Sequence, residues 1–459
     1  MRNPLLAPEL RELIEKKDGA ALQAFCASQH PTTAAEFLAS LTAPEIWHCL
    51  TRLEPRLRAE IFADLDQDLQ IELAQSLSRQ DLAQVINYMS ADERVDLLKR
   101  LPEDVQEALF PVLAQAEGEN IRRLSSHAEG TAGAVMTSDY ATLSPDETVE
   151  EAIAKLRREA PDRETIYYSY VVDSSRRLIG LVSLKDLILA RADKRIEEIM
   201  HRDLIFAHVT DDQEDVVHKI AKYDLIALPV VNDNNVLMGI ITHDDAIDII
   251  RQEHTEDMEK LMAIAGLHET GTYLRTSPWG HFKNRCVWLV ALAALGLVSG
   301  YIVQSFEGLL LQFAILATFM PMLADTGGNA GSQSATLVVR ALAVREISSQ
   351  DLLTVFWKEF KVGVSLTLLL GTFAVGRVFL FAGGSTRPDG YSLPSIGLAI
   401  GLALGIQVLT STLIGALLPL AAAKMKFDPA VVASPALTTV VDITGLLIFF
   451  TTARLMLGI

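Results

Sequence analysis

The chain has 459 residues, with 40 Lys and Arg against 58 Asp and Glu, so its formal net charge is −18. This charge is uneven, because residues 1–280 hold 50 acidic and 29 basic residues whereas residues 281–459 hold 8 and 11. The acidic part would repel nucleic acid, which excludes that class of partner. The three scattered cysteines predict neither a disulfide framework nor a cysteine metal site, so we expect this part to lie in the cytosol.

Residues 41–113 contain an internal repeat of 12 residues that begins with an apolar residue. The repeated positions are Leu41, Leu53, Leu65, Leu77, Met89, Leu101 and Leu113. In most copies Ser, Asp or Pro follows, which predicts the start of a short helix. Helices of two turns cannot bury an apolar face alone and must stack. We therefore predict an all-α solenoid within residues 1–128, in which these leucines serve only as core.

Residues 131–252 contain a longer repeat of strand, turn, strand and then Gly-apolar-apolar-Ser/Thr-x-x-Asp at the start of a helix. The last element places Ser183 and Asp186 in the first copy and Thr242 and Asp245 in the second. The pattern resembles a pair of α/β domains of the cystathionine-β-synthase (CBS) type, which we assign to residues 129–253. In that family these side chains can contact the ribose or phosphates of an adenine nucleotide such as ATP. Plain helix capping without a ligand explains them equally well.

Acidic residues gather around a predicted linker helix, which we assign to residues 254–280. They are Asp244, Asp245, Asp248, Glu253, Glu256, Asp257 and Glu259. In the predicted solenoid, Asp92 and Asp96 add two carboxylates at i, i+4 on one helix face. Like charges at that spacing destabilise a helix unless a cation bridges them. We interpret the set as cation-binding residues, with a solvated acidic face as the alternative.

Five apolar stretches within residues 281–459 predict a helical membrane domain. They cover residues 286–306, 308–339, 362–381, 391–423 and 429–456, each close to or beyond the ~20 residues that a span needs. A cytosolic N-terminus puts eight basic residues on the inner side and three on the outer side, as the positive-inside rule favours. The C-terminus then lies outside. Five helices rarely enclose a path alone, so we expect a two-fold homodimer in the lipid bilayer.

Asp442 is the only charged residue between residues 429 and 453. A carboxylate at bilayer depth costs roughly 2.5–3.5 kcal/mol and normally faces a protein interior or an aqueous path. Ser434, Thr438 and Asp442 share one helix face at i, i+4, i+8 spacing, and Asn329 offers a further polar group. We therefore interpret Asp442 as part of a cation site inside a membrane pathway. An intramembrane ion pair with a basic residue is the alternative.

The order of parts, together with two segments of the membrane region, resembles the MgtE family of magnesium channels and transporters. The first segment reads PMLADTGGNAGSQ over residues 321–333, and the second contains DPA, SP, TT and Asp442 between residues 428 and 442. The resemblance implies a homodimer of the cell membrane that is not an enzyme. It also implies that Asp442 binds Mg2+ in a pore leading into the cell, that cytosolic Mg2+ binding closes the pore, and that ATP binds the CBS pair in some members.

The main competing interpretation is a transporter of another divalent cation, such as Co2+ or Ni2+, with nucleotide-regulated CBS domains. Softer metals usually recruit His or Cys ligands. Residues 281–459 contain only His281 and Cys286 of these types, both at the edge of the predicted membrane domain. The sequence therefore favours a hard cation.

Overall fold

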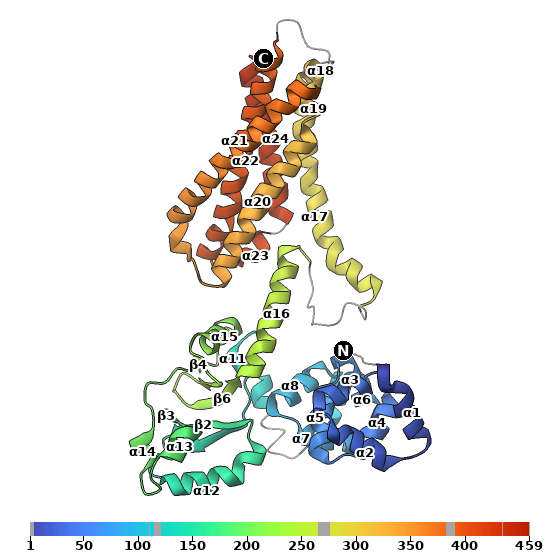
Figure 1. The fold of residues 1–459 in the computed structure, drawn as a ribbon, viewed down its shortest axis with the longest axis vertical. Helices are drawn as coiled ribbons and strands as arrows, with labels where there is room; N and C mark the ends of the chain where they lie inside the picture. Colours follow the sequence, from blue (N-terminus) through green and yellow to red (C-terminus); the bar gives the residue numbers. More distant parts are fainter. Residues whose placement is uncertain are drawn as a thin grey trace. The chain divides into compact units, whose positions relative to one another are not determined.

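The computed structural model describes residues 4–109, 111–113, 121–264, 276–381, 391–433 and 435–458. The chain forms two compact units, Met1–Ile250 and Arg251–Ile459 (Figure 1). The first contains short helices followed by two small sheets, and the second contains long helices.

Short helices build the first part of the Met1–Ile250 unit. They are η1 (Pro4–Leu6), α1 (Ala7–Glu15), α2 (Gly19–Ser28), α3 (Pro31–Leu38), α4 (Ala43–Leu50), α5 (Pro55–Ala63), α6 (Gln67–Ser76), α7 (Arg79–Tyr88), α8 (Ala91–Arg100) and α9 (Glu103–Leu109). The helix starts predicted by the 12-residue repeat are confirmed. At α7, for example, the Ser78 side chain accepts a hydrogen bond from the Asp81 backbone N–H.

The repeated apolar positions form the core of these helices, as predicted. Leu41, Leu53 and Leu65 are buried, and Leu77 is partly buried against the same core. Helices pack against the second helix along the chain, as α3 does on α5 and α5 on α7. No helix of this length could bury its apolar face without such neighbours.

Two three-stranded sheets follow, and they confirm the predicted internal repeat. The strands are β1 (Tyr140–Leu143), β2 (Thr165–Val172), β3 (Leu178–Ser183), β4 (Ala207–His208), β5 (Ala227–Val231) and β6 (Leu237–Thr242). The helices between them are α11 (Ala132–Val135), α12 (Val149–Glu159), η2 (Ala160–Asp162), α13 (Leu184–Leu189), α14 (Ile196–Ile199) and α15 (Gln213–Lys222). In each sheet the first two strands are parallel and the last two antiparallel.

The glycine shared by both copies has a packing role. A Cβ added to Gly180 would lie 2.5 Å from Sδ of Met200, and one added to Gly239 would lie 2.7 Å from Sδ of Met136. Met136 lies at the start of the first copy and Met200 at the start of the second. Each glycine therefore makes room for a methionine of the opposite copy, which interlocks the two repeats.

The predicted linker helix needs a correction at its start. A single helix, α16, runs over His243–Leu261 and begins directly after β6. The segment contains no Gly or Pro that could end the helix near residue 253. The C-terminal helix of the second CBS copy and the first part of the predicted linker are thus one element. Residues 265–275 of that linker lie outside the described part of the chain.

The Arg251–Ile459 unit contains the predicted membrane helices. They are α17 (Pro278–Ser305), α18 (Glu307–Gln312), α19 (Ala314–Ala317), α20 (Met320–Ala343), η3 (Ser349–Asp351), α21 (Leu352–Phe381), α22 (Leu393–Lys424), α23 (Pro429–Val432) and α24 (Pro435–Leu457). In the described residues, four of these, α17, α21, α22 and α24, are long and apolar enough to cross a membrane. Helix α20 has 24 residues, but it is rich in Gly, Ser, Thr, Asn and Gln.

The prediction of one continuous helix over residues 308–339 is wrong. Phe313 leaves the helical conformation, with φ −122° and ψ 70°, and separates α18 from α19. Helix α20 then begins with Pro321 in its first turn. A proline there has no N–H to continue a preceding helix, so it favours a new start.

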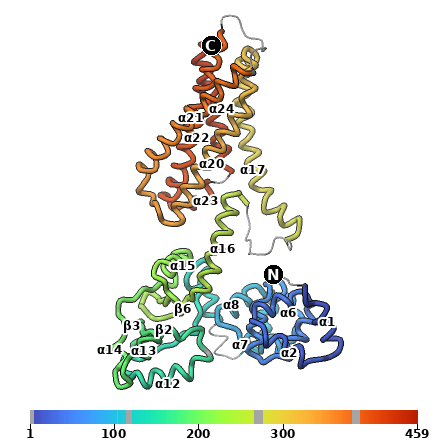
Figure 2. The backbone as a smooth tube through the Cα atoms, in the orientation of Figure 1, coloured from blue at the N-terminus to red at the C-terminus, as the bar shows by residue number. Residues whose placement is uncertain are grey.

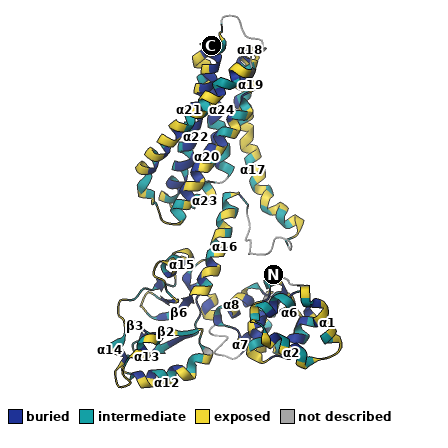
Figure 3. Ribbon diagram, in the orientation of Figure 1, coloured by how far each residue is buried: buried dark blue, intermediate teal, exposed yellow. Residues whose placement is uncertain are grey.

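Helix α22 lies at the centre of the bundle, where it packs against α20, α21 and α24 (Figure 2). It carries many buried residues, whereas most of α17 is exposed (Figure 3). Glycines allow the close approach: a Cβ added to Gly401 would lie 3.0 Å from the carbonyl oxygen of Gly371 on α21. Such small-residue contacts are typical of helix packing in membranes.

Candidate functional site

Asp442 and Thr438 of α24 face the glycine-rich part of α20. A Cβ added to Gly328 would lie 3.0 Å from Cγ2 of Thr438 and 4.0 Å from Oδ1 of Asp442. One turn further along α20, Oγ of Ser332 lies 3.4 Å from Oγ1 of Thr438. The absence of a side chain at Gly328 therefore leaves space beside the Asp442 carboxylate. The sequence interpretation missed Ser332, which belongs to the same polar face.

The Asp442 carboxylate is half-buried and incompletely paired. Its Oδ1 is buried without a hydrogen-bond partner in the described part of the chain. Among the same residues, no basic side chain forms an ion pair with it. The alternative of an intramembrane ion pair thus has no support within one protomer. An unpaired acceptor of this kind is costly to bury and suits a cation or its bound water.

The other two predicted pore residues have different outcomes. Asn329 is exposed, and its Nδ2 donates a hydrogen bond to Oδ1 of Asp325, 3.1 Å away on the same helix. Among the described residues, no hydrogen bond joins Asn329 to Asp442. Ser434 lies outside the described residues.

Two buried polar residues of this unit escaped the sequence analysis. Gln407 of α22 is 1% exposed, and its Nε2 donates to the carbonyl oxygen of Leu323 on α20 at 2.9 Å. Glu359 of α21 is 8% exposed, and its Oε2 accepts a hydrogen bond from Oγ of Ser334 on α20 at 2.8 Å. Glu359 is the only acidic residue within α21, and that isolation is a signal that could have identified it.

In the first unit, five carboxylates from three places in the chain influence one another. Asp92 and Glu93 lie on α8, Glu164 precedes β2, and Asp244 and Asp245 begin α16. Sequence reasoning selected Asp92, Asp244 and Asp245 but missed Glu93 and Glu164. We call these five residues the acidic cluster.

Four carboxylates of the acidic cluster have raised pKa values. Burial, followed by the charge of Asp92, raises the pKa of Glu93 and of Asp245 to about 7. Burial and then Asp92 and Asp245 raise the pKa of Glu164 to about 8. Burial also raises the pKa of Asp92, whose Oδ1 has no hydrogen-bond partner in the described residues. These carboxylates resist being charged together, so protons or cations should bind there.

The structure does not arrange the cluster as a metal-binding cage. Within the described ranges, no three His, Cys, Asp or Glu side chains are grouped closely enough to hold a metal ion directly. Cation binding by the cluster therefore stays a prediction. Bridging through water would demand less of the geometry, because Mg2+ keeps several of its waters in most protein sites.

The remaining predicted sensor residues lie apart or have other partners. Asp96 Oδ2 is 3.7 Å from Arg100 Nη2 on the same helix. Glu256 Oε1 is 2.6 Å from Lys260 Nζ, which also lies 2.8 Å from Asp428 Oδ2. The other four are exposed or partly exposed along α16, namely Asp248, Glu253, Asp257 and Glu259.

The predicted nucleotide residues form hydrogen bonds with one another at the starts of α13 and α16. Ser183 Oγ accepts a hydrogen bond from the Asp186 backbone N–H at 3.1 Å, and Asp186 Oδ2 accepts one from the Ser183 backbone N–H at 3.1 Å. In the second copy, Thr242 Oγ1 donates to Asp245 Oδ2 at 2.6 Å. The capping interpretation is therefore confirmed for Ser183 and Asp186. Nucleotide binding by all four residues stays a prediction.

Comparison with known protein families matches three models. A divalent cation transporter model, MgtE, matches residues 320–452. The MgtE intracellular N domain matches residues 29–130, and the CBS domain matches residues 132–193 and 196–252.

Curated relatives match over almost the whole chain. The magnesium transporter MgtE of Thermus thermophilus is 36% identical over 455 residues, which is 98% of each chain. The magnesium transporter MgtE of Bacillus subtilis is 30% identical over 391 residues, covering 85% of this chain and 84% of that one.

Solved structures match the first part of the chain. The soluble part of a magnesium transporter aligns with a TM-score of 0.51 and 32% identity, covering 54% of this chain and 97% of that one. The cytosolic domain of the Mg2+ channel MgtE in complex with ATP aligns with a TM-score of 0.50 and 35% identity, covering 53% of this chain and all of that one. Together, these matches show that the chain belongs to the MgtE family of magnesium transporters.

Proposed function

We propose that two copies of this chain form a channel or transporter in the cell membrane that moves Mg2+ into the cell. The observation that carries the proposal is the position of Asp442 on α24. Its partly buried carboxylate, with an unpartnered Oδ1 in the described residues, faces the side-chain-free surface of Gly328 on α20. In a two-fold dimer, two such carboxylates would meet at the axis and hold the cation.

The surrounding groups suit a hydrated ion. Thr438 and Ser332 supply hydroxyl groups beside Asp442, and Asn329 and Ser434 would add polar groups along the same path. Mg2+ demands octahedral oxygen ligands and releases water reluctantly. Two carboxylates with a few hydroxyl and amide groups can bind such an ion through its waters without supplying six direct ligands.

The proposed membrane topology has five spans. Helix α20 would be the fifth, beside α17, α21, α22 and α24, and its polar residues would be tolerated because they face protein or the ion path. The charge distribution places the N-terminus in the cytosol and the C-terminus outside. Helices α1–α9 would form a superhelical solenoid, since α2 to α9 each pack on the second helix along the chain.

We further propose that cytosolic Mg2+ closes the path by binding to acidic residues of the cytosolic unit. The acidic cluster supports this idea, because the charge of Asp92 raises the pKa values of Asp245 and Glu164, and the charge of Asp245 raises that of Glu164 further. Bridging cations would relieve that repulsion and favour a compact arrangement. A ligand shifts an equilibrium by its preference for one state, so the state with more bound Mg2+ would accumulate when cytosolic Mg2+ is abundant.

ATP is a second proposed ligand of the CBS pair. The supporting observation is the similarity to the cytosolic domain that was solved in complex with ATP. Binding would have to compete with the capping hydrogen bonds of Ser183 and Asp186, or leave them in place and use other groups. Titration of the full-length protein with ATP tests this, with Ser183→Ala as the variant and the distant Ser28→Ala as its control.

A transporter for Co2+ or Ni2+ remains the alternative substrate assignment. The matched family model describes divalent cations in general. However, residues 281–459 contain no His or Cys apart from His281 and Cys286, and softer metals favour such ligands. The hydroxyl groups of Thr438 and Ser332 near Asp442 favour Mg2+.

The proposal is tested by Mg2+ influx into liposomes that contain a Mg2+-sensitive dye. We expect Asp442→Ala to abolish influx and Asp442→Asn to reduce it strongly, whereas Glu346→Gln, at an exposed loop position, should transport like the unmodified protein. Normal influx in the Asp442→Ala variant would overturn the proposed pore. Inhibition by Co2+ or Ni2+ at much lower concentrations than Mg2+ would favour the alternative substrates.

A further inference from the structure

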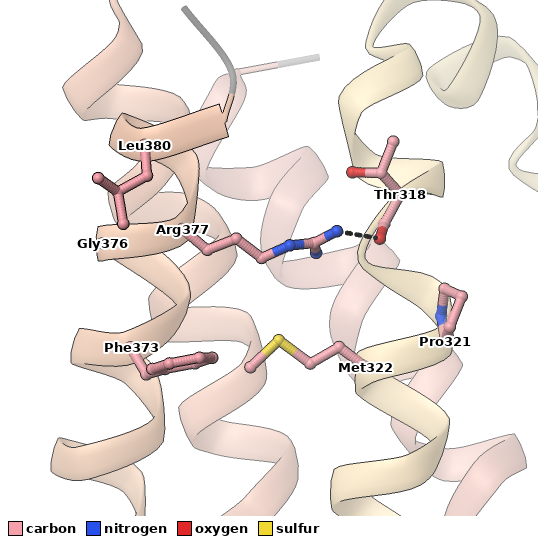
Figure 4. A pocket seen from close by; sticks show the side chains of 7 residues that line it. All are labelled: Thr318, Pro321, Met322, Phe373, Gly376, Arg377 and Leu380. Carbon is pink, nitrogen blue, oxygen red and sulfur yellow. Dashed lines mark hydrogen bonds between the residues drawn. The ribbon is translucent and has the colours of Figure 1, made fainter.

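A cavity of about 590 Å³ lies between the last turns of α21 and the segment around the start of α20. Its walls are formed mainly by apolar groups, including Pro321, Met322 and Phe373. One charged side chain, Arg377 of α21, reaches across it toward Thr318, as Figure 4 shows. The Asp442 pathway and the acidic cluster do not explain this combination of an apolar cavity with a single guanidinium.

Only some of the N–H donors of the Arg377 guanidinium have a hydrogen-bond partner in the described residues. Its Nη2 donates a hydrogen bond to the carbonyl oxygen of Thr318 at 3.0 Å, and the guanidinium carbon lies 4.1 Å from the centre of the Phe319 ring. Its Nη1 is buried and has no hydrogen-bond partner in the described part of the chain. Among the described residues, no carboxylate neutralises the charge. A full positive charge with spare donors thus remains beside the cavity.

The depth of Arg377 suits the boundary between hydrocarbon and headgroups. It lies four residues before the end of α21, which corresponds to roughly 6 Å along a helix. The apolar side chains around it are open to the surroundings, since Phe373 is 65% exposed and Leu380 is 78% exposed. Long basic side chains near helix ends commonly place their charge at this level.

We propose that this cavity binds an anionic phospholipid, with its phosphate on Arg377 and an acyl chain along Phe373 and Met322. Both the phosphate and the acyl chain of such a lipid fit the groups that line the cavity. A guanidinium pairs with phosphate through two parallel N–H donors, and Arg377 has donors to spare. The apolar wall below the guanidinium accepts a hydrocarbon chain. The inference rests on α21 spanning the bilayer and is independent of the ion that the protein transports.

Binding there would affect the proposed ion path through α20. The bound lipid would fill the space between α21 and the first turn of α20, the helix that carries Gly328 opposite Asp442. We therefore expect the lipid to support the position of α20, so that transport depends on the lipid composition.

Two variants test separately the charge of Arg377 and the space inside the cavity. Arg377→Gln keeps a hydrogen-bonding side chain but removes the charge. Gly376→Leu fills the cavity, and it should fold normally because a Cβ at Gly376 meets no atom within 4 Å. Gly300→Leu in α17 is the matched control, since a Cβ at Gly300 also meets nothing within 4 Å. Arg454→Gln, in the last turn of α24, controls for the loss of a basic residue at the same membrane face.

The experiment is native mass spectrometry of the full-length protein with added phosphatidylglycerol, and with phosphatidylcholine as the comparison lipid. We expect the unmodified protein to retain phosphatidylglycerol preferentially, and both Arg377→Gln and Gly376→Leu to bind it about tenfold more weakly. The two control variants should bind it normally. Equal binding by Arg377→Gln and the unmodified protein would overturn the proposal. So would loss of the dimer in Gly376→Leu with lipid binding unchanged, because a second copy of the chain would then fill the cavity.

Discussion

The ammonium group of Lys260 lies 2.8 Å from a carboxylate oxygen of Asp428 within the Arg251–Ile459 unit. The other oxygen of Asp428 accepts a hydrogen bond from the Ala430 backbone N–H and caps α23. Burial alone would lower the pKa of Lys260, but its hydrogen bonds to Asp428 and Glu256 raise it above the ordinary value. The end of α16 is thus tied to the segment that leads into α24 and Asp442.

We expect Lys260→Gln to weaken the closure of the path when cytosolic Mg2+ is high. The pair is partly exposed, with about a third of each side chain accessible, so its loss should cost at most ~1 kcal/mol. That corresponds to an increase in flux of up to about fivefold in liposomes with high Mg2+ on the cytosolic side. Lys185→Gln, at an exposed position of the first unit, is the control.

Charge reversal tests whether Lys260 and Asp428 act as a pair. Lys260→Asp alone should increase flux at high Mg2+, and the double variant Lys260→Asp with Asp428→Lys should restore inhibition in part. If the double variant conducts as freely as the single one, the ion pair does not control closure.

Because of the acidic cluster, we expect the folded cytosolic unit to become less stable as the pH rises when divalent cations are absent. The pKa of Glu164 is raised to about 8 and that of Asp245 to about 7 in the folded protein, against roughly 4 for such groups when unfolded. A raised carboxyl pKa stabilises the folded state fully below the unfolded pKa, and this contribution is lost as the pH rises through the folded value. Thermal unfolding of the cytosolic unit in full-length protein should therefore occur at a lower temperature at pH 8.5 than at pH 6.

The Glu164→Gln variant should reduce this pH dependence, because it removes one of the repelling charges. Glu150→Gln, at an exposed position of α12, should leave it unchanged. Added Mg2+ should raise the unfolding temperature more at pH 8.5 than at pH 6, since protons compete with the cation at low pH. A Mg2+ effect of the same size at both pH values would show that the cation binds elsewhere.

The sequence predicted those features that local patterns determine. The 12-residue repeat located the helices α4 to α9, and the Ser183 and Asp186 element located a helix start, because caps and buried positions recur at short spacing. Asp442 could be selected since a lone charge in an apolar segment is costly. Pairing between distant segments was not visible: Gln407 bonds to Leu323, 84 residues earlier in the chain.

The errors have a similar physical origin. Hydrophobicity alone could not reveal the break at Phe313, because the flanking residues on both sides are apolar. Glu164 was missed because it lies far along the chain from Asp92 and Asp245, and only the folded unit brings their charges into mutual influence. Identifying a residue such as Glu164 requires knowledge of how α8, β2 and α16 are arranged in space.

The buried Gln407 side chain leaves no room for a side chain at two neighbouring glycines, so we expect transport to depend on them. A Cβ added to Gly445 of α24 would lie 2.5 Å from the Gln407 Nε2, and one added to Gly327 of α20 would clash with the same atom. Gly445→Ala should therefore push the Gln407 amide away from the Leu323 carbonyl oxygen, costing ~1–3 kcal/mol as overpacking commonly does. We expect a lower unfolding temperature and lower Mg2+ flux.

A second substitution tests this explanation of Gly445. Gln407→Ala creates space, so the double variant of Gly445→Ala and Gln407→Ala should transport better than Gly445→Ala alone. Gly296→Ala in α17 is the control, because a Cβ at Gly296 meets no atom within 4 Å. No recovery in the double variant would show that Gln407 is not the obstacle.

The hydrogen bond between Ser334 and Glu359 predicts that a buried carboxylate of the membrane unit has a structural role. Glu359→Gln preserves its size and an acceptor for the Ser334 hydroxyl, so folding and Mg2+ flux should be largely retained. Glu359→Ala removes the acceptor and buries the Ser334 hydroxyl without a partner, which should destabilise the protein by ~1–3 kcal/mol.

The coupling between the two residues is measured by the unfolding temperatures of Glu359→Ala, Ser334→Ala and the double variant. The effects of the two substitutions should be distinctly non-additive because the residues are in contact. Additive losses would contradict the pairing, and a loss of flux in a well-folded Glu359→Gln variant would mean that its charge belongs to the ion path.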